Sequence, residues 1–320
     1  MSSPYSLERR IAIEAVYQAS HLASSLQGRL KSLDIVGKSD LSPVTLADFS
    51  IQALINLHLL SAFPQDKIMG EEDADDLRNP KNSALAENIC KEVRIFHPEL
   101  TNGMILDAID AGNFAGGSRE RFWVLDPIDG TKGFIRGEGY AVALALIVNG
   151  EVVLGILGCP KLSETGGMLI AVKGGGCFFL GFEEDAEEVP LHVAENTLPE
   201  GVVYCDPEAS SLAKGYAVAQ AMGAKAEPLT LDNLCQYALV AMGETSIYLR
   251  FPSSEHHHEK LWDHAPGVVI VEESGGRVTD LYGKPLDFSL GNSLETNQGL
   301  LVTNGLLHEK VLRALAGVLA

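Results

Sequence analysis

Two apolar runs separated by Asn149-Gly150 constrain the fold of this chain more than any other feature. The runs cover residues 140–148 and 151–158, and each is predicted to be a strand. An Asn-Gly pair between two such runs is the strongest short-range signal of a β-hairpin. A second hairpin is predicted where residues 168–172 and 177–180 flank three consecutive glycines. The middle of the chain is therefore expected to form a largely antiparallel sheet.

Helical spacing of apolar residues is found before this sheet. Residues 8–30 carry such a pattern, and a second helix is expected to begin at Thr45 and to continue until a proline stops it. Thr45 and Asp48, three positions apart, have the pattern of a capping box. Asp107 and Asp110 lie on a third predicted helix and, with no partner motif, are interpreted as part of a solvated face.

Beyond residue 193 helices and strands alternate, which predicts an α/β unit. We therefore expect an α/β fold of two domains with the active site between them. The first domain, residues 1–192, would be α+β with an antiparallel sheet, and the second, residues 193–320, would be α/β. The strands predicted in the second domain are 201–205, 247–249 and 299–303, and its predicted helices are 212–222, 233–242 and 266–273.

Composition excludes several classes of function. The chain has 24 Lys and Arg against 43 Asp and Glu, a net charge of −19, which repels nucleic acid and anionic membranes alike. No apolar stretch reaches the roughly 20 residues that a membrane span needs, and the first residues do not resemble a signal peptide. The 5 cysteines are scattered and form no Cys-x-x-Cys pair. We expect reduced thiols, a cytoplasmic protein and a small-molecule partner.

The most informative segment reads Trp-Val-Leu-Asp-Pro-Ile-Asp-Gly-Thr-Lys-Gly-Phe. A buried strand would deliver Asp126 to its end, the proline would fix a bend, and Asp129 would point back into the same space. We expect the turn to leave the Ile128 carbonyl unpaired, so that it provides a third oxygen ligand for a hard cation such as Mg²⁺. Gly130 and Thr131 follow at a predicted helix start, where backbone N–H groups favour a phosphate.

Each acidic motif also has a purely structural interpretation. Asp-Pro-x-Asp-Gly is rich in ordinary turn residues. Glu71 belongs to a charged segment, 67–76, of the kind that usually forms a solvated loop. Asp263 at a predicted helix start would complement the helix dipole, and Asp48 would only cap its helix.

Taken in order, these motifs resemble those of a known superfamily. The order Thr-x-x-Asp, Gly-Glu-Glu, Asp-Pro-Ile-Asp-Gly-Thr and Trp-Asp-His-Ala is similar to that of the lithium-sensitive, magnesium-dependent phosphomonoesterases, which include inositol monophosphatases and fructose-1,6-bisphosphatases. Ser-Pro-Val-Thr at 42–45 and Asp-Pro-Ile-Asp-Gly-Thr-Lys-Gly-Phe-x-Arg-Gly at 126–137 resemble its 3′(2′),5′-bisphosphate nucleotidase branch. The resemblance implies a layered αβαβα fold and hydrolysis of 3′-phosphoadenosine 5′-phosphate to AMP, with the 5′-phosphosulfate as a further substrate.

The resemblance also implies a role for each matching residue. Two or three Mg²⁺ ions and inhibition by Li⁺ are expected. The metal ligands would be Glu71, Asp126, the Ile128 carbonyl, Asp129 and Asp263. Asp48 and Thr131 would orient and deprotonate the attacking water. The substrate would contact Gly130, Thr131, Ser210, Asn233, Gln236, Arg250 and Asp263.

The chain departs from the nucleotidase branch where the second phosphate would bind. The branch has Ser and Lys where this chain has Asn233 and Gln236, and Ser210 is the nearest counterpart, in an ungapped count, of a histidine in the branch. Arg250 matches the arginine that lies beside the adenosine. The second phosphate therefore loses a cation, which predicts lower affinity or broader specificity.

Other features receive structural interpretations, and two rival functions stay open. The three histidines at 256–258 are interpreted as a solvated loop rather than a soft-metal site. A monomer is expected. The rivals are an inositol phosphatase and a non-catalytic protein that binds divalent cations. The complete set of acids, together with Thr131, argues against the second rival.

Overall fold

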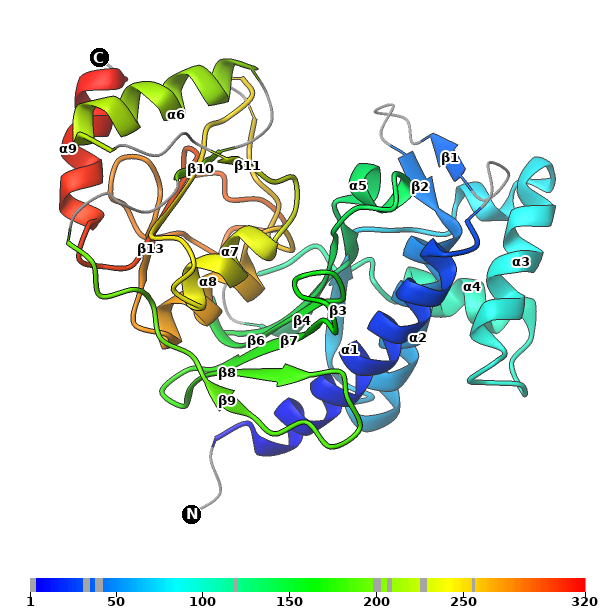
Figure 1. Cartoon of the computed structure of the whole chain (residues 1–320). Helices are drawn as coiled ribbons and strands as arrows, with labels where there is room; N and C mark the ends of the chain where they lie inside the picture. Colours follow the sequence, from blue (N-terminus) through cyan, green and yellow to red (C-terminus); the bar gives the residue numbers. More distant parts are fainter. Residues whose placement is uncertain are drawn as a thin grey trace.

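The structure, a computed structural model, describes residues 4–30, 35–37, 43–117, 120–197, 203–205, 209–224, 229–254 and 257–319. Two main sheets organise these residues (Figure 1). The seven-stranded sheet contains β3 (Lys67–Gly70), β4 (Arg121–Asp129), β5 (Ala141–Val148), β6 (Glu151–Cys159), β7 (Gly167–Val172), β8 (Gly176–Gly181) and β9 (Val189–Pro190). The five-stranded sheet contains β10 (Val203–Cys205), β11 (Leu229–Thr230), β12 (Ile247–Arg250), β13 (Arg277–Thr279) and β14 (Leu300–Thr303). A separate pair is formed by β1 (Ile35–Gly37) and β2 (Pro43–Thr45).

Both hairpins predicted from the sequence are present. β5 and β6 pair across Asn149 and Gly150, whose φ angles of 54° and 80° are those that a two-residue hairpin turn requires. β7 and β8 pair across Gly174 and Gly176, which also have positive φ. The carboxylate of Glu273 accepts the N–H groups of these two glycines at 2.8 and 2.9 Å. The glycine run is thus a hairpin turn.

The two main sheets differ in the directions of their strands. The seven-stranded sheet runs β3-β4-β5-β6-β7-β8-β9, and β3 is parallel to β4 while the other neighbours are antiparallel. In the five-stranded sheet β10 is parallel to β11 and β12, and β14 is antiparallel to β12 and β13. The first sheet is therefore largely antiparallel, as predicted, and the second is mixed.

Helices cover both faces of each main sheet (Figure 1). They are α1 (Ser6–Gln27), α2 (Leu46–Ala62), α3 (Ser83–Val93), α4 (Asn102–Asp110), α5 (Thr131–Ile135), α6 (Ala209–Met222), α7 (Cys235–Ala241), α8 (Ala265–Glu273), α9 (His308–Val318) and two short 3₁₀ turns, η2 (Asp76–Arg78) and η3 (Pro80–Asn82). α1 and α2 cover one face of the larger sheet, α7 and α8 lie between the sheets, and α6 and α9 cover the outer face of the smaller sheet. These layers confirm the αβαβα fold. No helix within the described ranges is both long and apolar enough to cross a bilayer.

Alternate residues of β4 belong to different cores. Trp123 and Leu125 pack in the apolar cluster formed with α1 and α2, whereas Phe122 and Val124 pack in the cluster formed with α7 and α8. The second cluster extends to Val302 of β14. The two sheets therefore share a continuous core across the proposed domain boundary, and the division into two domains stays a prediction.

Several segments differ from the sequence predictions, among them β4, the segment 67–76 and α3. β4 extends beyond the predicted residues 122–125, because its pairing with β5 continues past the Asp-Pro pair. The charged segment 67–76, interpreted as a solvated loop, begins with β3, the edge strand that pairs with β4. α3 was not predicted, although its buried Leu85, Ile89 and Val93 recur every four residues.

The described cysteines are packing residues, as expected. Cys90, Cys159, Cys177 and Cys235 are free and buried. Burial raises the pKa of the Cys177 thiol to about 12, so its reactive thiolate is not populated near neutral pH.

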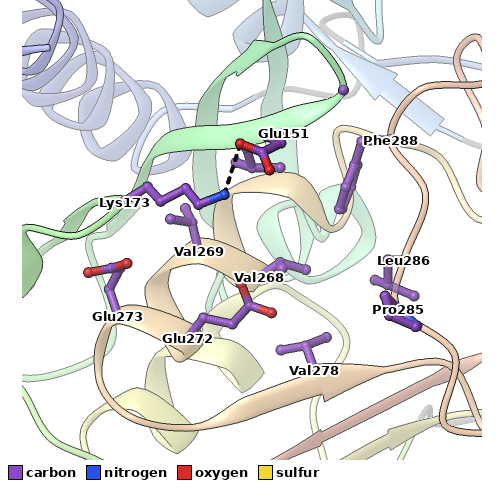
Figure 2. Close-up of a pocket in the computed structure, with 12 residues that line it drawn as sticks. Glu151, Lys173, Val268, Val269, Glu272, Glu273, Val278, Pro285, Leu286 and Phe288 are labelled. Carbon is purple, nitrogen blue, oxygen red and sulfur yellow. Dashed lines mark ion pairs between the residues drawn. The ribbon is translucent and has the colours of Figure 1, made fainter. Parts of the chain in front are cut away.

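A cavity of about 210 Å³ lies along the C-terminal half of α8, where this helix faces the start of β6 (Figure 2). Val268 and Phe288 contribute apolar walls, and the ion pair between Lys173 and Glu151, 2.9 Å long, lies at its edge. Asp263, a predicted metal ligand, precedes the other end of α8. This cavity is therefore separate from the predicted site.

The position of α8 depends on a close approach to β6. A Cβ atom at Gly155 would lie 2.5 Å from Cγ1 of Val269 and 2.7 Å from the carbonyl oxygen of Pro266, both in α8. Only glycine allows this spacing. Because Asp263 directly precedes α8, the packing at Gly155 also positions one of the predicted metal ligands.

We predict that Gly155→Ala lowers the free energy of unfolding by about 1–3 kcal/mol, the usual cost of overpacking. The matched control is Gly317→Ala in α9, where an added Cβ meets no atom within 4 Å. There alanine should be neutral or stabilising because of its higher helix propensity. Urea denaturation of both variants checks this. Equal stabilities for the two would show that α8 does not need the glycine.

Candidate active site

A register shift at the end of β4 places two aspartates side by side. In a regular strand, residues three apart point to opposite faces. Here Asp126 lies opposite Ala143 and Asp129 opposite Ala141, so three steps along β4 match two along β5. Such a bulge re-aims side chains. The N–H of Ile128 donates to Oδ1 of Asp126 at 3.1 Å and closes the turn.

Acids from two other segments join this pair. Asp263, just before α8, has a carboxylate oxygen that lies with those of Asp126 and Asp129 within 4.8 Å of one another. Glu71 follows β3, its N–H donates to the Leu125 carbonyl at 3.1 Å, and its side chain is hydrogen-bonded to Asp126. The structure thus brings together the four acids that the sequence analysis selected as metal ligands.

The electrostatics of these acids require a compensating positive charge. Burial raises the pKa of Asp126 well above its usual value, and the charges of Glu71, Asp129 and Asp263 raise it further. Burial also raises the pKa of Asp129 to about 7 and that of Asp263 well above its usual value, although the positive charge of Arg250 opposes both shifts. Buried like charges are stable only when protons or cations neutralise them. A set of carboxylate oxygens is the donor set that Mg²⁺ prefers, so these residues fit that ion.

Asp48 connects the cap of α2 with the bend after β4. The backbone N–H and the hydroxyl of Thr45 donate to its Oδ2 at 2.8 and 2.6 Å, which confirms the capping box. The Thr131 hydroxyl lies 3.4 Å from Oδ1 of Asp48 and 3.1 Å from the Ile128 carbonyl oxygen. Asp48 therefore does more than cap its helix. The expectation that the Ile128 carbonyl is unpaired was wrong, because Thr131 donates to it, although an oxygen with two lone pairs retains a second acceptor position.

Gly130 begins α5 and lies against the segment before α7. Its φ is 89°, and an added Cβ would lie 2.8 Å from Cβ of Asn233 and 2.9 Å from the carbonyl oxygen of Asp232. The N–H of Leu234 donates to the Asp129 carboxylate. The turn before α7 is thus attached to a predicted metal ligand. A phosphate at the start of α5 stays a prediction.

The amides of Asn233 and Gln236 are held by main-chain carbonyls. Nδ2 of Asn233 donates to Gly139 at 3.1 Å, and Nε2 of Gln236 donates to Leu231. Both side chains are buried. They therefore brace the turn before α7 in this structure, and their contact with substrate stays a prediction. The side chain of Ser210, a third predicted contact, lies outside the described residues.

Arg250, at the end of β12, belongs to a buried network that the sequence analysis missed. Its Nε lies 3.0 Å from Oε2 of Glu259, and Nε2 of His264 lies 3.2 Å from the same oxygen. Nδ1 of His264 is 2.8 Å from the Tyr237 hydroxyl. Burial lowers the pKa of His264, and both its ring nitrogens are engaged, so it is a structural histidine rather than a metal ligand. No periodic pattern in the sequence links Arg250 to Glu259, so no local signal could have found this network.

A polar face of α2 also escaped the sequence analysis. Asp48, Gln52 and Asn56 recur every four residues within an otherwise apolar helix, and all three are buried. Nε2 of Gln52 donates to Ile109 at 3.0 Å, and its Oε1 accepts the N–H of Glu72 at 3.0 Å. Gln52 thus fixes the loop that carries the acids after β3.

Asp110 of α4 fixes the same loop, so interpreting it as part of a solvated face was wrong, whereas Asp107 is exposed as expected. Asp110 accepts the N–H of Ala74 at 2.8 Å and forms an ion pair with Arg78 at 2.5 Å. Asp107 is more exposed and lies 3.1 Å from Arg78. Because a loop of like charges repels itself, this anchorage keeps it beside β4.

Comparisons with known proteins agree with this geometry. The sequence pattern of the inositol monophosphatase family matches residues 5–319. The chain is 38% identical over 339 residues to a 3′(2′),5′-bisphosphate nucleotidase of Schizosaccharomyces pombe, with 98% of this chain and 96% of the relative covered. It is 36% identical to a 3′(2′),5′-bisphosphate nucleotidase of Oryza sativa, with 98% and 94% covered. An IMPase of Thermotoga maritima has a TM-score of 0.67 at 24% identity, with 97% of each chain covered.

We predict that the metal-free protein loses stability as the pH rises from about 4 to about 7. Folding raises the pKa of Asp129 to about 7, so the folded protein holds a proton that it must give up over this range. Excess Mg²⁺ should remove the loss. Asp129→Asn should weaken both effects, because Asp126 and Asp263 still have raised pKa values, whereas Asp185→Asn, at an exposed carboxylate, should change neither. Melting temperatures near pH 5 and pH 8, with and without Mg²⁺, check this. A melting temperature that rises over this pH range without Mg²⁺ would contradict it.

Proposed function

Because the chain belongs to the inositol monophosphatase family, we propose that it is a Mg²⁺-dependent phosphomonoesterase that hydrolyses the 3′-phosphate of 3′-phosphoadenosine 5′-phosphate to give AMP and phosphate. The observation that carries the chemistry is the convergence of Asp126, Asp129 and Asp263 beside the pair formed by Asp48 and Thr131. The choice of a nucleotide over an inositol phosphate rests on the relatives named bisphosphate nucleotidases.

The acids and one carbonyl would hold the metal. The proposed ligands are Glu71, Asp126, the Ile128 carbonyl, Asp129 and Asp263. When bound, Mg²⁺ supplies positive charge that polarises the phosphoryl group and acidifies adjacent water. We propose two or three ions, and inhibition by Li⁺ because a small hard cation competes for the same oxygens.

Asp48 and Thr131 would orient the attacking water and remove its proton. The cap of α2 fixes Oδ2 of Asp48, so the carboxylate cannot rotate freely, and Oδ1 stays on the side of Thr131. A base fixed in this way, within hydrogen-bonding reach of the water, is what general-base catalysis requires. His264 is unsuited to replace it, because each ring nitrogen has one hydrogen-bonding position and both are engaged, whereas a carboxylate oxygen keeps a further acceptor position.

The proposal also covers a second substrate, the oligomeric state and the cellular compartment. The 5′-phosphosulfate analogue is proposed as a second substrate, because it differs from the bisphosphate away from the reacting 3′-phosphate. We propose a monomer in the cytoplasm, and the free buried cysteines support a reducing compartment.

Phosphate release from a panel of nucleotides and inositol phosphates, with and without Mg²⁺, tests the proposed function. We expect Mg²⁺-dependent release that is fastest from 3′-phosphoadenosine 5′-phosphate. Faster release from inositol bisphosphates would instead identify an inositol phosphatase. No release from any compound would identify a protein that binds cations without catalysis.

We predict different effects for two aspartate variants. Asp126→Asn should abolish activity and weaken Mg²⁺ binding, because an amide cannot replace a charge in a cluster of metal ligands. Asp48→Asn should leave most Mg²⁺ bound and reduce kcat by about 10²-fold or more, the usual loss on removing a general base. The side-chain oxygen of asparagine at this N3 position can still accept the N–H of Thr45, so the fold should be retained. Calorimetric Mg²⁺ titrations and steady-state kinetics check both variants. Near-normal turnover of Asp48→Asn would remove Asp48 from the mechanism.

A further inference from the structure

The carboxylate of Glu259 holds two cationic side chains at the edge of the candidate site. Nε of Arg250 lies 3.0 Å from its Oε2, and Nε2 of His257 lies 3.4 Å from its Oε1. The Glu259 side chain is only 6% exposed, whereas Arg250 is 28% and His257 39% exposed. A buried acid thus anchors two cations that can still contact a ligand.

This pair of cations lies beside the proposed metal ligands. Glu259 and Asp263 have carboxylate oxygens within 4.8 Å of each other, and Asp263 lies equally close to Asp126. The charge of Arg250 lowers the pKa of Asp263, and the charge of Asp263 raises that of His257. Glu259 therefore links the two cations to the cluster of proposed metal ligands through Asp263.

The charged side chains around Glu259 favour the binding of an anion. Although burial opposes it, Arg250 and the hydrogen bonds from His257 and His264 hold the pKa of Glu259 below its usual value, so this acid is ionised and balances Arg250. The hydrogen bond to Glu259 raises the pKa of His257, whose other charged neighbours are Arg250 and Asp263. Arg250 and, when protonated, His257 thus share the single carboxylate of Glu259, which leaves positive charge for an anion.

Position 236 does not provide this cation. Gln236 is neutral, and its amide donates to the Leu231 carbonyl. Asn233 is likewise neutral and donates to Gly139. The loop between β12 and α8 therefore supplies, through His257, a positive charge that the turn before α7 lacks.

We propose that Arg250 and His257 bind the second, non-reacting phosphate of the substrate and that His257 determines the preference for a bisphosphate. This inference rests on the proposed function. A phosphate between the two side chains would accept charge-assisted hydrogen bonds from both. Glu259 is a positioning residue, because it holds both cations without touching the substrate. For His257, this replaces the interpretation of residues 256–258 as a merely solvated loop.

Steady-state kinetics of three histidine variants test the inference. His257→Gln should raise KM for 3′-phosphoadenosine 5′-phosphate on the order of tenfold, the loss expected for one charge-assisted hydrogen bond. For adenosine 3′-monophosphate, which lacks the second phosphate, the change should stay below about twofold. His257→Arg should keep the bisphosphate KM close to that of the wild type. His258→Gln, on an exposed neighbour, is the matched control.

Calorimetric titration with AMP tests the anion site independently of the proposed reaction. AMP carries only the second phosphate, so His257→Gln should weaken its binding about tenfold, while adenosine binding should not change. If the wild type releases no phosphate from the bisphosphate, the proposed function fails and the AMP titrations still decide the anion site. Unchanged AMP binding by His257→Gln, or equal effects on bisphosphate and monophosphate, would overturn the inference.

Discussion

Repulsion among buried carboxylates is the constraint on which the rest of this structure depends. The bulge between Asp126 and Asp129 places both side chains in one space, and Asp263 and Glu71 arrive there from distant parts of the chain. Burial raises the pKa of three of these acids, so the cluster is unfavourable as four free charges. Such an arrangement persists only when the surrounding scaffold holds it and a cation compensates it. The cluster at the junction of the two sheets therefore fits the metal site proposed above.

The scaffold opposes this repulsion with contacts that carry no reaction chemistry. Gln52 fixes the loop after β3 through two main-chain hydrogen bonds, and Asp110 fixes it through Ala74. Gly155 lets α8 approach β6 closely enough to present Asp263. The cap of α2 orients Asp48 toward the same turn. The cap contacts Oδ2 of Asp48 and Thr131 contacts Oδ1, so capping and the proposed general-base role would use the two oxygens of one carboxylate.

Local signals made much of the fold predictable. The Asn149-Gly150 turn and the helical spacing of apolar residues each act within a few positions, and the structure confirms the elements they predict. The acids of the site were found because their motifs resemble those of a family, whereas the bulge that unites Asp126 and Asp129 was expected only as a bend. The missed contacts link distant segments: Arg250 reaches Glu259 across a loop, and Gln52 reaches the loop after β3. Periodicity carries no information about such partners, so the packed structure was needed to find them.

Displacement of protons by Mg²⁺ tests the central claim most directly. Acids whose pKa is raised by burial and mutual repulsion hold protons that a metal must release when it binds. Calorimetric titration with Mg²⁺ near pH 6, in buffers of different ionisation enthalpy, measures this release. The account predicts that about one proton or more leaves per protein and that the number falls as the pH rises above 7. Mg²⁺ binding without proton release at either pH would show that the cluster is not the site at which the metal binds.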